Sequence, residues 1–115
     1  MMDRTMMERC AQICHECQDV CLEAVPHSLD LGGSWATREH QTLLADCIAI
    51  CGVSHNLLHR QSPQHTHTCR ACAEICHTCA DECDRMARGD RLMQECADAC
   101  RRCAESCDRM AAARA

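Results

Sequence analysis

Three copies of one pattern set the architecture of this chain: CAQICHECQDVC at 10–21, CAEICHTCADEC at 72–83 and CADACRRCAESC at 96–107. Each copy reads C-A-x-x-C-x-x-C-x-x-x-C, so successive cysteines are alternately four and three residues apart. This spacing places the cysteines on one stripe of an α-helix, whereas a β-strand would need a period of two residues. The repeat therefore predicts helices that each carry a row of thiols.

A fourth, degraded copy, CIAICGVSHNLL at 47–58, has Ser54 and Leu58 in place of its last two cysteines. Helix-breaking residues separate the copies. The stretch from Pro26 to Thr37 is rich in Gly and Ser, Ser62-Pro63 is typical of a helix start, and Arg88-Gly89-Asp90 is typical of one helix ending and another beginning. We expect a single domain over 1–115, an all-α, up-down-up-down antiparallel four-helix bundle. Its helices are expected at about 3–25, 37–61, 63–88 and 90–113.

The composition shows what fills the core of such a bundle. The 115 residues include fifteen Cys and only fifteen Leu, Ile and Val together, with no Phe or Tyr. In the heptad register of the cysteines, alanines such as Ala73, Ala80, Ala97 and Ala104 flank the stripe, and charges lie mainly on the opposite face. The thiols are therefore predicted to point inward, so that cysteine itself forms the core.

Bulk properties exclude several classes of function. No run of 18 apolar residues predicts a transmembrane helix, and the amino-terminal MMDRTMMERC lacks the apolar segment of a secretory signal. With no export signal, an odd number of cysteines favours reduced thiols in the cytoplasm over a secreted disulfide scaffold. The net charge of −5 provides no basic surface for nucleic acid. We expect neither nucleic-acid nor membrane binding.

A row of thiols in a bundle core favours a soft metal ion. A buried Cys can serve packing alone, but fifteen in one interior make that reading weak because Leu would fill the space better. Residues four apart on a helix can close on one ion. Thiolates select Cu(I), zinc or iron–sulfur clusters. Zinc prefers four ligands, and iron–sulfur clusters use loop motifs absent here, so multiple Cu(I) ions fit best. The expected pairs are Cys10/Cys14, Cys17/Cys21, Cys47/Cys51, Cys72/Cys76, Cys79/Cys83, Cys96/Cys100 and Cys103/Cys107, with Cys69 left over.

Further soft ligands continue the stripes toward both ends of the predicted bundle. Thioethers also bind Cu(I), and imidazoles bind several metals, so these residues are candidate ligands. One end carries His40, Met86 and Met93, and the other carries Met7, Met110, His65, His55 and His59. By contrast, His15 and His77 fall at heptad positions that face solvent.

The repeat resembles that of the bacterial copper storage proteins, which are cysteine-rich four-helix bundles. The resemblance covers almost the whole chain and, because the chain has no export signal, points to the cytosolic branch. It implies storage of many Cu(I) ions on C-x-x-x-C pairs, Met or His near the mouth, and a homotetramer. The departure at Ser54 and Leu58 suggests a lower capacity near Met7 and Met110, and suggests that this end is the mouth.

We therefore expect reversible storage and sequestration of Cu(I) without catalysis. Copper would enter past Met and His, move inward between thiolates and displace thiol protons. The alternatives are a buffer for zinc or another soft metal and a structural bundle that uses Cys for packing. A thiol redox enzyme is disfavoured because it needs one or two exposed, low-pKa cysteines, and none stands out. The sequence does not identify the copper donor or acceptor.

Overall fold

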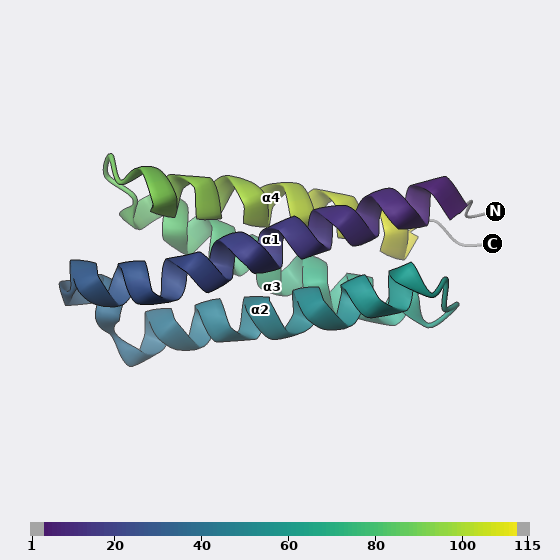
Figure 1. The fold of residues 1–115 in the computed structure, drawn as a ribbon, viewed down its shortest axis with the longest axis horizontal. Helices are drawn as coiled ribbons and strands as arrows, with labels where there is room; N and C mark the ends of the chain where they lie inside the picture. The colour runs from purple at the N-terminus through teal and green to yellow at the C-terminus, as the bar shows by residue number, and fades with distance from the viewer. Residues whose placement is uncertain (1–3, 113–115) are drawn as a thin grey trace.

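Four long helices pack side by side into an elongated bundle (Figure 1). The computed structural model describes residues 4–112, and these measure 46 × 19 × 17 Å. Helix α1 packs against α2 and α4, and α3 packs against the same two helices, with neighbours antiparallel (Figure 1). The predicted all-α, up-down-up-down bundle is confirmed. The helices are α1 Arg4–Leu31, α2 Arg38–His59, α3 His65–Met86 and α4 Arg91–Ala112, with a short 3₁₀ helix, η1, at Gly33–Ala36.

The first helix is longer than predicted, because it continues through Pro26 to Leu31 instead of ending at residue 25. Tertiary contacts account for the extension. The Ser28 hydroxyl is buried, donates to the Val25 carbonyl and accepts a 2.8 Å hydrogen bond from Gln41 of α2. Proline inside a helix removes one backbone donor and crowds the carbonyl four residues earlier, so these contacts offset a local cost. Helix α1 ends just before Gly32, whose φ of 74° suits glycine.

The other helix ends lie within two residues of their predicted positions. Thr37 caps α2 by accepting from the His40 N–H, and Asp90 caps α4 by accepting from the Met93 N–H at 2.9 Å. Helix α3 begins at His65, two residues later than the Ser62-Pro63 signal suggests. Predicted helix positions 3 and 113 lie outside the described residues.

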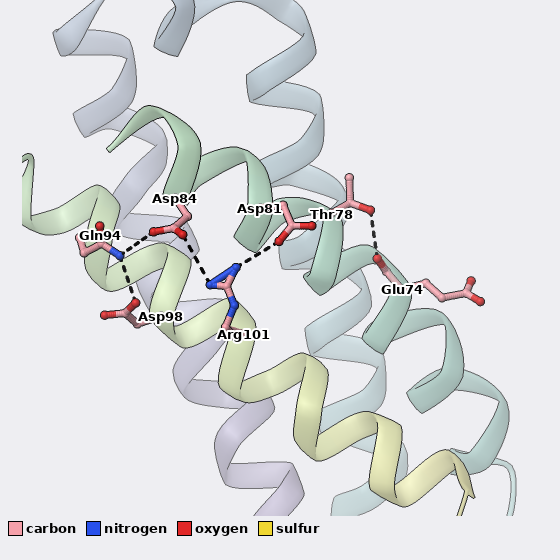
Figure 2. A network of polar contacts seen from close by, with 7 residues as sticks. All are labelled: Glu74, Thr78, Asp81, Asp84, Gln94, Asp98 and Arg101. Atoms are coloured by element: carbon pink, nitrogen blue, oxygen red, sulfur yellow. Dashed lines mark hydrogen bonds and ion pairs between the residues drawn. The ribbon is translucent and has the colours of Figure 1, made fainter. Parts of the chain in front are cut away.

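A polar network on the surface fixes α4 against α3 (Figure 2). The Arg101 guanidinium donates to Asp81 at 3.1 Å and lies 3.9 Å from Asp84. The Gln94 amide donates to Asp84 and also to Asp98 on its own helix. Exposed pairs of this kind stabilise a protein by at most about 1 kcal/mol each.

Helix α2 combines a buried thiol face with an exposed apolar face. It is long and apolar enough to cross a membrane by length and composition alone, with a mean hydropathy of 1.2, and 28% of that stretch is buried. Core helices of soluble bundles have the same length and composition. Here α2 buries Cys47, Cys51, Leu44 and Leu58 against the other helices.

Candidate metal centre

The sulfur core, meaning the fifteen cysteines together, occupies the axis of the bundle. Every one of these side chains is at most 1% exposed, and all fifteen are free thiols. The flanking alanines are buried beside them, as the heptad register predicts. All four helices contribute: Cys10, Cys14, Cys17 and Cys21 from α1, Cys47 and Cys51 from α2, Cys69, Cys72, Cys76, Cys79 and Cys83 from α3, and Cys96, Cys100, Cys103 and Cys107 from α4.

Sulfur atoms from different helices are in direct contact. The Sγ of Cys47 lies 3.6 Å from that of Cys76, 3.7 Å from that of Cys100 and 3.8 Å from that of Cys21. Towards the start of α1, the Sγ atoms of Cys14 and Cys107 are 3.6 Å apart. The expected i,i+4 pairs are thus only part of the arrangement, since most of these short contacts join two helices. An ion could pass from one group of thiols to the next without leaving sulfur.

Five groups of thiols have all their sulfur atoms within 4.8 Å of one another. Four groups contain four cysteines and the fifth contains three. The groups are Cys14/Cys72/Cys103/Cys107, Cys17/Cys47/Cys51/Cys76, Cys17/Cys21/Cys47/Cys100, Cys51/Cys72/Cys76/Cys103 and Cys10/Cys69/Cys107. Because neighbouring groups share members, they form a connected series rather than separate sites.

Hydrogen bonds between buried thiols lower the pKa of some cysteines, such as Cys47, and raise the pKa of others. Hydrogen bonds with Cys17, Cys21 and Cys47, together with burial, raise the pKa of Cys100 well above its ordinary value. Hydrogen bonds with Cys103 and Cys17, again with burial, raise the pKa of Cys51. Cys51 and Cys100 hold their protons at neutral pH, so a soft cation must displace a proton from each of these two thiols when it binds there.

This gives a pH prediction for the metal-free protein. Thiols ionise near pH 9 in the unfolded chain, whereas those with raised pKa stay protonated in the folded bundle. Their contribution to stability is complete below pH 9 and is lost progressively above it, because the unfolded chain then binds fewer protons than the folded bundle. Few other groups titrate there, because the chain has no Tyr or Lys. Urea unfolding at pH 8 and pH 10 measures the loss, and an unchanged midpoint would contradict it.

One end of the bundle is formed by the starts of α1 and α3 and the ends of α2 and α4 (Figure 1). Met7, Met110 and His65 are all buried there, as predicted for this end. The His65 Nδ1–H donates to the Ser62 carbonyl at 2.7 Å, and the buried Nε2 has no hydrogen-bond partner. An imidazole held in this way presents Nε2 as a ligand atom.

The same end also carries a small cavity of about 150 Å³ that reaches Cys10 and Met110. Ser54 and Leu58, which replace cysteines of the repeat, are both fully buried. The Ser54 hydroxyl has no hydrogen-bond partner. The sequence departure therefore lies in the core, as the stripe predicts.

The opposite end carries His40 and Met93, both buried, and Met86, which is half-buried. Neither ring nitrogen of His40 has a hydrogen-bond partner. Burial lowers the pKa of His40, which keeps its imidazole neutral and able to bind a metal. The Trp35 ring packs edge-on against the His40 ring, with 5.1 Å between the ring centroids. A cavity of about 310 Å³ opens beside the His40 imidazole. Sequence periodicity could not find Trp35, because it comes from the connecting segment.

His55 and His59 lie on the outside of the α1–α2 pair, where His55 is half-buried and His59 is exposed to solvent. The structure brings them next to His15, which the heptad register assigned to the solvated surface. The His15 and His55 rings are 5.3 Å apart between centroids, and those of His55 and His59 are 5.6 Å apart. No single-helix pattern reveals this, because it depends on how α1 is placed against α2.

Comparison with known proteins identifies a family and several relatives. The family model for copper storage protein matches residues 2–112. The uncharacterized cysteine-rich protein YhjQ of Bacillus subtilis strain 168 is 36% identical over 77 residues, which cover 66% of this chain. That match spans 64% of the length of YhjQ.

Two solved structures have the same fold along nearly their whole length. The Cu(I)-bound copper storage protein BsCsp3 is 30% identical, with a TM-score of 0.84, over 93% of this chain and 99% of that one. A cytosolic copper storage protein from Streptomyces lividans, studied during copper loading with five coppers, is 27% identical with a TM-score of 0.88. That alignment covers 97% of both chains.

Proposed function

This chain belongs to the copper storage protein family, and from that membership we propose that it stores several Cu(I) ions on the thiolates of its sulfur core. One observation carries the proposal: sulfur atoms from all four helices are buried and in contact at 3.6 to 4.0 Å. Two or three thiolates per ion suffice for Cu(I), and the shared groups provide many such sets. No catalytic role is proposed.

Charge and geometry favour Cu(I) over zinc. A zinc ion bound by four thiolates leaves two negative charges in the core, and buried charge is costly. One Cu(I) per thiolate leaves the core neutral. Because the four-cysteine groups share members, at most two of them can hold a four-coordinate ion at once. The zinc alternative therefore fills the core poorly, and metal analysis of protein exposed to both ions distinguishes the two.

We place the mouth at the end that carries Met7, Met110 and His65. The free Nε2 of His65 and the two thioethers offer weak ligands ahead of the group Cys10/Cys69/Cys107. From there Cu(I) exchanges along neighbouring thiolates while their protons leave. His40, Met86 and Met93 serve as terminal ligands at the opposite end.

Copper uptake kinetics test this assignment. His65→Ala should slow Cu(I) uptake roughly tenfold, the scale expected when a metal site loses a polar contact, with little change in the final amount bound. His40→Ala is the matched control, because it removes a buried imidazole from the opposite end. Stopped-flow measurement of Cu(I) transfer from a coloured complex gives the rates. If His40→Ala slowed Cu(I) uptake while His65→Ala took up Cu(I) at the normal rate, the mouth would lie at the opposite end.

The proposal extends to location and assembly. The cytosolic copper storage protein of Streptomyces lividans supports a cytosolic store here. We propose a homotetramer in which another copy covers the exposed apolar face of α2, where Ala49, Ile50 and Val53 line an open groove with Ile75 of α3. Sedimentation of the purified protein measures the assembly.

A further inference from the structure

We propose a second metal site, separate from the sulfur core, in which His15, His55 and His59 bind one divalent first-row ion. The three histidines, here called the imidazole row, lie on the outer surface where α1 meets α2. Two of them lie four residues apart on α2, and the third comes from α1. The site does not depend on copper storage, because none of its ligands is a sulfur.

The rings are already next to one another. His15 and His55 are tilted by 41° at 5.3 Å between centroids, and His55 and His59 are nearly parallel at 5.6 Å. Histidines four residues apart on one helix face are a common metal-binding pair. The third imidazole, from α1, makes the site tridentate and ties the two helices together. His59 is exposed and His15 is half-exposed, so their rings can turn toward a shared ion.

One of the three imidazoles has a hydrogen-bond acceptor at one ring nitrogen, as metal-bound histidines usually do, and a second has a carboxylate near one ring nitrogen. The His55 Nδ1–H donates to the Ala11 carbonyl at 2.9 Å, which leaves Nε2 as the ligand atom. The His15 Nε2 lies 3.4 Å from the Asp19 carboxylate, which leaves Nδ1 for the ion. The Asp19 charge also offsets part of the charge of a divalent cation.

The donor set decides the class of ion. Neutral imidazoles suit Zn²⁺, Cu²⁺ and Ni²⁺, whereas the hard ions Mg²⁺ and Ca²⁺ require oxygen. With three protein ligands on an exposed face, water completes the coordination. The surface site therefore takes an ion of different charge and softness from the Cu(I) of the core.

The test follows the histidine rings directly by NMR while Zn²⁺ is added. The protein is first loaded with Cu(I) so that zinc does not titrate the thiols. We expect the ring signals of His15, His55 and His59 to shift together and to saturate at one equivalent. In the metal-free protein the same three signals should shift together once enough Zn²⁺ has been added to saturate the thiols, so the test does not depend on copper storage.

Variants identify the ligands. His59→Ala should weaken zinc binding at least about tenfold, and Asp19→Asn, which removes only an outer partner, should weaken it about tenfold. His77→Ala, an exposed histidine on α3, is the control and should leave binding unchanged. Thermal melting checks that each variant is folded. The site would be overturned if the three ring signals shifted independently or did not shift at all when Zn²⁺ is added. It would also be overturned if His59→Ala and His77→Ala bound Zn²⁺ equally well.

Discussion

Loading with Cu(I) is expected to raise the midpoint of thermal unfolding by about 15 °C or more. A single site with free ligand 1,000-fold above its Kd adds about 4.1 kcal/mol to the free energy of unfolding. For a chain of this size, each kcal/mol corresponds to roughly 4 °C. Several sites fill the core, so the total shift should exceed this value. Circular dichroism melts of the reduced and the copper-loaded protein measure it.

The physical reason is the composition of the core. Among residues 4–112, only Leu44, Leu58 and Met93 are large apolar side chains that are fully buried, and most of the remaining interior is Cys and Ala. Such a core buries little apolar area and gives a metal-free bundle of modest stability. An unchanged midpoint after loading would instead favour a structural bundle in which Cys serves packing.

Removing the two thiols of α2 is expected to lower the number of Cu(I) ions bound per chain more than removing two thiols near the end of α3. Three of the five groups contain Cys47, Cys51 or both. The double variant Cys47→Ala, Cys51→Ala therefore breaks all three. The matched control, Cys79→Ala with Cys83→Ala, also removes two thiols but touches none of those groups. We expect a loss of about three or more ions in the first variant and about two in the second, given that Cu(I) accepts two or three soft ligands.

Equilibrium loading followed by copper and protein quantification of each variant gives these numbers. Urea unfolding of the metal-free variants shows that both still fold, because each deletion leaves two small cavities. Equal losses from the two variants would mean that copper sites are independent i,i+4 pairs and not shared groups.

The cysteine repeat alone predicts the fold and the inward direction of the thiols. A spacing of four and three determines a helical stripe, and a stripe of buried side chains requires partners, so a four-helix bundle follows. The sequence also placed Ser54 and Leu58 in the core. These predictions are confirmed because they depend on periodicity within one helix.

Features that depend on contacts between helices could not be predicted in the same way. Local propensity predicts that the first helix ends at residue 25, before Pro26, yet the hydrogen bond from Gln41 to Ser28 supports a helix that ends at Leu31. The pairs expected within single helices are joined across helices into shared groups. The proximity of His15 to His55 likewise depends on how α1 packs against α2.

Anaerobic titration of the reduced protein with Cu(I), against a competing chelator and with thiols counted in the same sample, tests the central claim most directly. Uptake should reach many ions per chain, on the order of its fifteen cysteines, because buried thiolates are neutralised by about one Cu(I) each. Saturation at one or two ions per chain, with the other thiols still free, would contradict storage in the sulfur core.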